Sequence, residues 1–311
     1  MILDTIEGEF LVSEYSDTSS IVRIRDHELN SLLNNTDLVI KLSTDTINLN
    51  NEFMFHCELN DNKMFANDIH ALGWSSGELA RVAKPVGIIT EENEIIPFTK
   101  STNYIENVIG LIFPYYGKPI NQFLDEQLTK PSQRVKLISK VAKTIALLNS
   151  KGIIYDDICE DNILVNPQGK VTIIDFNTIQ TIRHGHDYPT RLDTNMFYLA
   201  FTNGYEAPEG FKTAIDFYNK MNHKNSDLYL AYITFSKERG HQILFSRDDL
   251  NKAQNTIDPL TFDSYSIALL AEHLGVKIPK RFKAINSHRR GNIFELIQYL
   301  DVFRKGDRRW F

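Results

Sequence analysis

The segment from Gly152 to Asn177 constrains the fold of this chain more than any other stretch of its sequence. Asn166-Pro-Gln-Gly169 has the residues of a tight turn. The apolar runs on either side of it, Ile163–Val165 and Val171–Ile174, have the length and composition of two short strands. The segment is therefore predicted to fold into a β-hairpin about this turn.

Three polar side chains belong to the open end of that hairpin. Asn162 precedes the first strand and Asp175 follows the second, so we expect the two residues to lie opposite each other. Both are hard oxygen ligands of the kind that Mg²⁺ prefers. Asp157 lies five residues before Asn162, in the loop that leads into the first strand, and we expect it to reach the same cleft. The grouping predicts a magnesium site beside a carboxylate that can aim a hydroxyl group.

This arrangement resembles the catalytic loop and metal-binding loop of the eukaryotic-type protein kinases, in which His-Arg-Asp, four residues, Asn, a hairpin and Asp-Phe-Gly follow in order. Tyr155-Asp156-Asp157, Asn162 and Asp175-Phe176-Asn177 stand in those places here. Further along, Glu206-Ala-Pro-Glu209 contains the Ala-Pro-Glu that closes a kinase activation segment. Asp263–Leu274 resembles the large helix that follows it, whose leading Asp braces the catalytic loop.

The resemblance is strongest from about Val108 to Leu274, and it implies an α+β, bilobal protein-kinase-like fold. We expect a β-rich N-lobe over residues 1–113 that covers the nucleotide, and a hinge over 114–117. A helical C-lobe over 118–311 is expected to carry the catalytic loop and the activation segment, with an insert at about 210–259.

The hydrophobic pattern predicts the individual elements of both lobes. Strands are expected in two or three runs between Gly8 and Leu42, in a strand–turn–strand over Gly87–Ile96, and over Ile109–Phe113. Helices are expected between Asp61 and Ala83, over Pro131–Lys151, and within the insert over Ala214–Met221 and Asp227–Phe235.

Lys41 ends an apolar run and resembles the strand lysine that contacts the α- and β-phosphates of the nucleotide. An exposed lysine at a strand end is the alternative interpretation. Glu78, at the start of a capped helix-like stretch, is the favoured acidic partner of Lys41, with Asp68 as the alternative. Either acid could instead lie on a plain helix surface.

The loop expected to cover the phosphates departs most from the family. Glu14–Ser20 stands in its place and contains no glycine, although glycines normally let backbone N–H groups approach phosphate closely. Ser19 and Ser20 can still offer N–H and hydroxyl donors, whereas Asp17 would repel phosphate. We expect weaker or differently arranged ATP binding at this loop.

The hinge candidate is Phe113-Pro114-Tyr115-Tyr116. By the resemblance, Phe113 is the gatekeeper, the Pro114 carbonyl accepts from the adenine amino group, and the Tyr116 N–H donates to a ring nitrogen. Proline is acceptable at position 114 because only its carbonyl is used. An ordinary turn after a core strand is the alternative interpretation.

The resemblance makes Asp157 the catalytic base or hydroxyl-orienting group. Asp156 replaces an arginine that many relatives use to hold a phosphorylated activation segment, so we expect no gating by that phosphorylation. Cys159 replaces a lysine beside the transferred phosphate. Another cation (Lys41, Arg183 or Arg191) would have to supply its charge, or turnover would be slow.

The triplet that begins with Asp175 also departs from the family, because Asn177 stands in place of glycine. Asparagine tolerates left-handed φ better than most residues, so it partly substitutes. Asp175-Phe-Asn-Thr-Ile-Gln180 is similar to a stretch in some bacterial kinase-like proteins, which points to a divergent branch of bacterial or viral origin.

Composition limits the setting and the partners. No apolar run is long enough to span a bilayer, and the acidic N-terminus lacks the basic region of a signal peptide. Cys57 and Cys159 form no disulfide framework or metal spacing, so we expect a cytoplasmic protein, with a secreted effector that lacks a recognisable signal left open. A net charge of −6 argues against nucleic-acid binding.

Together, these observations predict an ATP-dependent phosphotransferase, of the serine/threonine protein kinase type, that uses Mg²⁺, or Mn²⁺ in its place. A pseudokinase that serves as a binding or scaffold module is one alternative, favoured by the glycine-free loop, Cys159 and Asn177. A small-molecule kinase is another, but the Ala-Pro-Glu motif argues against it because that segment builds a peptide-docking platform. An adenylylating pseudokinase also stays open.

The insert is the expected site of a regulatory partner, with an extra packing helix pair as the alternative.

Overall fold

The chain forms two compact units in the computed structural model, called here the sheet unit and the helical unit. The sheet unit contains Met1–Leu72, Val82–Gly117 and Ile174–Asn177, and the helical unit contains Gly73–Arg81, Lys118–Ile173 and Thr178–Phe311. Within the residues that the structure describes, no helix is long and apolar enough to cross a membrane. The structure describes residues 8–12, 19–24, 27–34, 37–61, 69, 71–99, 105, 107–127, 130–181, 205, 207–212, 228–238, 243–253 and 257–304.

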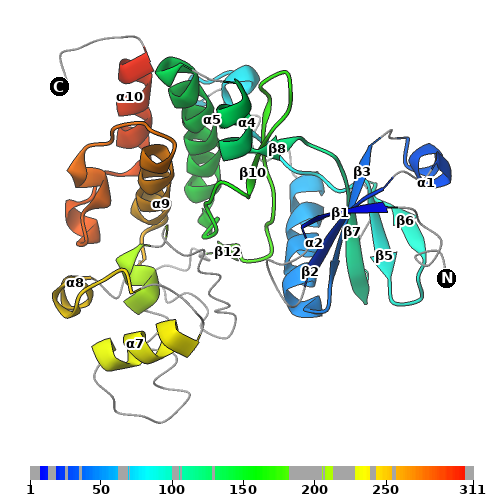
Figure 1. The fold of residues 1–311 in the computed structure, drawn as a ribbon, viewed down its shortest axis with the longest axis horizontal. Helices are drawn as coiled ribbons and strands as arrows, with labels where there is room; N and C mark the ends of the chain where they lie inside the picture. Colours follow the sequence, from blue (N-terminus) through cyan, green and yellow to red (C-terminus); the bar gives the residue numbers. More distant parts are fainter. Residues whose placement is uncertain are drawn as a thin grey trace. The chain divides into compact units, whose positions relative to one another are not determined.

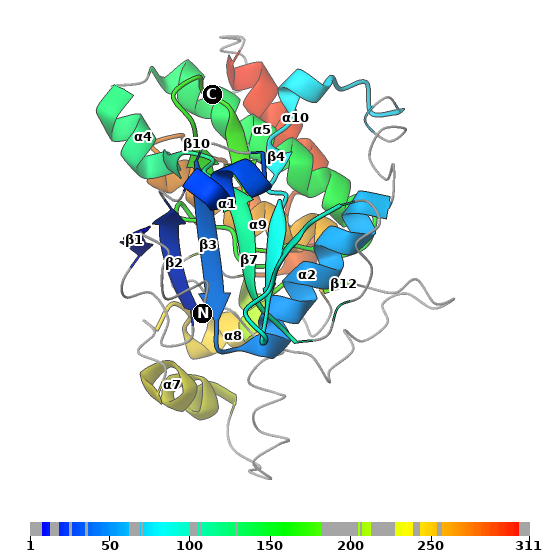
Figure 2. The ribbon, with the colours of Figure 1, turned by 90° about the vertical axis from the view of Figure 1, so that its right-hand side faces the viewer.

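The sheet unit is built on six strands, each antiparallel to its neighbours (Figure 1). Helix α2 (Thr46–Asp61) lies against β7 along one face of the sheet, and the short helix α1 (His27–Leu32) precedes β3 (Figure 2). The strand order across the sheet is β1 (Gly8–Val12), β2 (Ser19–Ile24), β3 (Leu38–Ser43), β7 (Val108–Pro114), β5 (Gly87–Thr90) and β6 (Ile95–Pro97).

Alternation along β3 sends its side chains to opposite faces of this sheet. Leu38 and Ile40 are buried in a cluster that includes Leu29 of α1. Lys41 therefore points to the other face, where Phe53 of α2 lies in a second buried cluster with residues of β5 and β7. The strand period thus places the lysine on the face that α2 covers.

The helical unit packs three long helices together (Figure 1). Helix α5 (Pro131–Ser150) contacts both α9 (Pro259–His273) and α10 (Ile293–Arg304). The other helical elements are α4 (Ile120–Gln127), α7 (Leu228–Glu238), α8 (Arg247–Lys252), η2 (Ser76–Glu78), η4 (Lys280–Lys283) and η5 (Ser287–Arg289).

Short strands complete the helical unit. Strand β10 pairs with β8 and with β11, and β12 pairs with β9. Strand β4 (Arg81–Val82) lies where the chain passes between the two units. The bounds of the others are β8 (Lys118–Pro119), β9 (Ile153–Ile154), β10 (Ile163–Val165), β11 (Val171–Ile173) and β12 (Gln180–Thr181).

Most of the predicted elements are confirmed. The hairpin is formed by β10 and β11 with Ile163 opposite Ile173, and Gly169 supplies its turn with φ of 71°. The predicted strand–turn–strand appears as β5 and β6, the buried strand as β7, and the helix over Pro131–Lys151 as α5. The second helix expected in the insert is α7, whereas Ala214–Met221 lies outside the described residues.

The main helix of the sheet unit, α2, was not predicted from the sequence. The helix expected between Asp61 and Ala83 falls largely on residues 62–68 and 70, which lie outside the described residues; Ile69 and Ala71 are helical, and the short turn η2 follows them. Helix α2 contains four asparagines, which have poor intrinsic helix propensity, so its stability comes from packing on the sheet.

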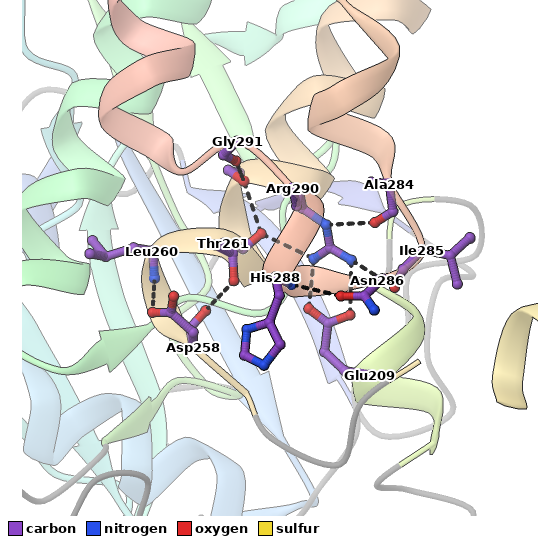
Figure 3. Close-up of polar contacts among 11 residues, drawn as sticks. Glu209, Asp258, Leu260, Thr261, Ala284, Ile285, Asn286, His288, Arg290 and Gly291 are labelled. Carbon is purple, nitrogen blue, oxygen red and sulfur yellow. Dashed lines mark hydrogen bonds and ion pairs between the residues drawn. The ribbon is translucent and has the colours of Figure 1, made fainter. Parts of the chain in front are cut away.

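The end of the expected activation segment is tied to the helical core by a buried ion pair (Figure 3). Both oxygens of Glu209 accept from Arg290, at 2.6 and 3.0 Å, and both side chains are 0% exposed. Arg290 also donates to the carbonyl oxygens of Thr261 and Ala284, which lie in α9 and after η4. The guanidinium group thus joins three separate parts of the helical unit.

Replacing Arg290 by Met is expected to lower the free energy of unfolding by about 3–5 kcal/mol, because the Glu209 carboxylate stays buried without its counter-charge. Urea denaturation followed by circular dichroism measures the loss. Arg289→Met changes an exposed neighbour and should shift stability by less than about 0.5 kcal/mol. Equal losses in the two variants would show that the buried pair stabilises the fold no more than the exposed arginine does.

Candidate active site

Lys41 lies between two carboxylates within the sheet unit. Its Nζ donates to Glu52 Oε2 at 2.7 Å and to Asp175 Oδ1 at 2.6 Å. Lys41 is 7% exposed and Glu52 is fully buried. The lysine is therefore not an exposed strand end, and its placement follows from the alternation along β3.

The carboxylate partner of Lys41 differs from the predicted one. Glu52 of α2 fills that role, whereas Glu78 belongs to the helical unit and accepts from Lys143 Nζ at 2.9 Å. Hydrogen bonding to Lys143 is the main reason that the pKa of Glu78 is lowered to about 2. The prediction of Glu78 as the partner is thus corrected, and the alternative Asp68 lies outside the described residues.

Both members of the Lys41–Glu52 pair stay charged at neutral pH. Burial works to lower the pKa of Lys41, but the nearby charges of Asp175 and Glu52 outweigh it and raise that pKa. Burial likewise works to raise the pKa of Glu52, but the charge of Lys41 reverses the effect and lowers the value to about 2. Lys41 and Glu52 therefore form a buried ion pair, and the Asp175 carboxylate is a second partner of the lysine.

The second oxygen of Glu52 holds the segment that carries Asp175. Glu52 Oε1 accepts from the backbone N–H of Phe176 at 3.1 Å. The Phe176 ring stacks on Phe55 of α2, with ring centroids 4.6 Å apart. His56 Nε2 lies 3.8 Å from the same Glu52 oxygen, which is beyond hydrogen-bond distance. Residues of α2 therefore position both Lys41 and Asp175.

Asp175 itself adopts left-handed backbone geometry with φ of 60°, and Asp156 does the same with φ of 65°. Non-glycine residues in this region store strain that the surrounding contacts must offset, and such residues gather at functional sites. Here the bonds of Lys41 and Phe176 to Glu52 supply the offset for Asp175. The strain fits a carboxylate that is held in place for binding.

Within the helical unit, Asn162 is fixed against Asp157. Its Nδ2 donates to the backbone oxygen of Asp157 at 3.0 Å and to Asp157 Oδ2 at 2.6 Å. Asn162 is 8% exposed, and its Oδ1 accepts no hydrogen bond from the residues that the structure describes. Its amide oxygen is a hard donor of the kind that Mg²⁺ prefers, as is, in the sheet unit, the Asp175 carboxylate.

Asp263, in helix α9, holds the loop before Asp157 in place, as the resemblance implies. Asp263 is fully buried, and its Oδ2 accepts from Asn149 Nδ2 at 2.6 Å and from the Tyr155 N–H at 3.2 Å. Burial raises the pKa of Asp263 to about 6, although these hydrogen bonds act in the opposite direction. The brace therefore depends on an acid whose charge state changes in mildly acidic solution.

Cys159 is a buried free thiol. Burial and the nearby charge of Asp157 raise the pKa of Cys159, which keeps the thiol neutral. It brings no positive charge to the position where relatives carry lysine. Arg183 and Arg191, the other expected sources of that charge, lie outside the described residues.

The remaining predicted nucleotide contacts belong to the sheet unit. Ser19 and Ser20 form the first residues of β2 rather than a loop, and Ser20 is exposed, while residues 13–18 lie outside the described part. Pro114 is the last residue of β7. The Tyr116 hydroxyl bonds to the backbone of Lys84. Their contacts with a nucleotide stay predictions.

The raised pKa of Asp263 sets the direction of a pH effect on stability. The folded chain holds this proton up to about pH 6, whereas an unperturbed aspartate loses it near 3.8, so the contribution is fully present below about pH 4 and is lost as pH rises through 6. Asp263→Asn cannot titrate and should gain about 2–2.5 kcal/mol relative to the native chain between pH 4 and pH 7. Urea denaturation at both pH values measures this, and a constant difference would contradict it.

Comparison with known proteins agrees with this geometry. Residues 88–289 match the family model described as protein kinase domain. The serine/threonine-protein kinase WNG2 of Toxoplasma gondii is 26% identical over 104 residues, which cover 33% of this chain and only 16% of that protein. The sheet unit and the helical unit correspond to the N-lobe and the C-lobe of a bilobal kinase fold. The chain belongs to the protein kinase domain family.

Proposed function

We propose that this chain is an active protein kinase that transfers the γ-phosphate of Mg-ATP to a Ser or Thr hydroxyl of a protein. The observation that carries the proposal is the buried contact of Lys41 with both Glu52 and Asp175. In this family the strand lysine must be paired with a helix glutamate, and the aspartate of the metal loop must be in place, for transfer to occur.

The residues of the site divide the work between them. Lys41 would contact the α- and β-phosphates, while Asp175 and Asn162 would hold Mg²⁺, which neutralises charge on the phosphates. Asp157 would orient the attacking hydroxyl and accept its proton. Because phosphoryl transfer is catalysed mainly by positioning and charge neutralisation, side chains fixed by buried bonds suit it well.

A protein substrate is supported by the end of the activation segment. Ala207 and Glu209 are buried, and the Glu209–Arg290 pair holds this segment to the helical core. A segment anchored in this way suits a platform on which a peptide docks, as the family resemblance implies. The proposal of Ser and Thr rather than Tyr as acceptors is supported by the name of the matched Toxoplasma protein.

Substituting Asp157 or Asp175 by Asn is expected to reduce phosphate transfer by about 10²–10⁴-fold, because the former removes the proton acceptor and the latter a metal ligand. Transfer of ³²P from γ-labelled ATP to a mixed protein substrate measures the rate, and phosphoamino-acid analysis identifies the acceptor. Asp125→Asn, at an exposed position of α4, is the control. Equal signals from all four proteins would exclude catalysis by this site, and nucleotide binding without transfer would favour the pseudokinase.

Glu52→Gln is expected to slow transfer by at least about ten-fold, because a neutral amide no longer holds Lys41 in its charged contact. Glu78→Gln removes a more exposed ion pair, to Lys143 in the other unit, and should leave the rate within about two-fold. Steady-state rates at saturating ATP compare the two variants. A larger effect of Glu78→Gln would restore the partner that the sequence favoured.

A further inference from the structure

The linker that follows β7 (residues 115–117) is held by the Arg23 side chain of β2 and by the backbone of Asp37, the residue before β3. Arg23 donates to both oxygens of Asp37, from Nε at 2.8 Å and from Nη2 at 2.7 Å. The same guanidinium carbon lies 4.1 Å from the centroid of the Tyr115 ring. The Tyr115 N–H donates to the backbone oxygen of Asp37 at 2.9 Å. One residue of the linker is thus fixed by both its ring and its backbone.

The next linker residue is anchored elsewhere in the sheet unit. The Tyr116 hydroxyl accepts from the Lys84 N–H and donates to the Lys84 carbonyl, each at 2.9 Å. Tyr116 also packs against the buried cluster that contains Phe113. Two successive tyrosines therefore attach the linker to different parts of the same unit, which leaves its backbone little freedom.

Backbone alternation then determines where the linker presents its polar groups. The Ile112 carbonyl accepts from the Val86 N–H at 2.7 Å, on the side of β5, whereas the Tyr115 N–H points toward Asp37, on the side of β3. In extended chain, successive residues direct their N–H and C=O to opposite sides. By this alternation, the Pro114 carbonyl and the Tyr116 N–H are expected to face away from β3. These are the two residues proposed to contact adenine.

We propose that Arg23, Asp37 and Tyr115 form a clamp that positions the linker for the purine base of ATP. The inference rests on the proposed function and adds three positioning residues to it. The clamp works by removing conformational freedom before the nucleotide arrives, so less entropy is lost on binding. Arginine is required because its planar fork matches both carboxylate oxygens and its face lies over an aromatic ring, which the ammonium group of lysine cannot reproduce.

Because the clamp residues are partly exposed, their effect on nucleotide binding can be measured separately from any effect on folding. The Arg23 and Asp37 side chains are 31% and 39% exposed, and pairs at such positions contribute little to global stability. The clamp contacts the part of the unit proposed to receive the base, whereas Lys41 is proposed to contact the phosphates and Asp175 to hold Mg²⁺. Loss of the clamp should therefore weaken recognition of the base alone.

The test compares two probes, Mg-ATP and Mg-tripolyphosphate, by isothermal titration calorimetry on the full chain. Arg23→Met and Tyr115→Leu are expected to weaken Mg-ATP binding about three- to ten-fold while leaving Mg-tripolyphosphate binding unchanged. In the transfer assay KM for ATP should rise with kcat within about two-fold. Arg23→Lys should recover only part of the ATP affinity. The control is Lys283→Met, which breaks an ion pair of comparable exposure in the helical unit and should change neither affinity.

Each other outcome overturns the inference in a distinct way. If the native chain binds Mg-ATP and the clamp variants bind it equally well, the clamp has no role and the proposed function stands. If the variants lose affinity for both probes alike, the three residues are merely structural. If the native chain binds neither probe, the proposed function fails and the clamp fails with it.

Discussion

The placement of Lys41 between two carboxylates is the interaction on which the rest of the structure depends. A buried lysine without a counter-charge would be costly, and the same holds for a buried glutamate, so neither can be kept without the other. Their pairing joins β3 to α2, and the third partner, Asp175, brings in a segment more than a hundred residues further along the chain. The sheet unit therefore holds three charged groups together: Lys41 on β3, Glu52 on α2, and Asp175 in the segment that follows β11.

The helical unit uses the same principle for a different purpose. Arg290 joins the end of the activation segment to α9, and Asp263 joins α9 to the loop that carries Asp157. Both groups are buried, and both bond to backbone atoms as well as to side chains. Because backbone contacts fix the path of the chain, the proposed catalytic loop and the proposed peptide platform have one common support.

Local patterns in the sequence were enough to predict the hairpin of β10 and β11, the strands of the sheet and helix α5, because each has a clear apolar period. The main errors concern α2 and the partner of Lys41. The asparagines of α2 hide its helical character, since its stability comes from contacts with β7 and not from propensity. Ser75 and Glu78 do bond to each other as a helix start would require, but they bound only a single turn, and Glu78 pairs with Lys143. Glu52 was not among the acids considered, and only its tertiary contact with Lys41 identifies it as the partner.

The two oxygens of Glu52 act on different partners, Lys41 and the Phe176 amide, and this has a consequence for motion in the sheet unit. Any outward swing of α2 that releases the lysine must at the same moment release the backbone beside Asp175 and unstack Phe176 from Phe55. The helix and the metal-loop carboxylate therefore lose their working geometry in a single concerted step. A compound or protein that wedges α2 away from β3 would displace both Lys41, the proposed phosphate contact, and Asp175, the proposed metal ligand.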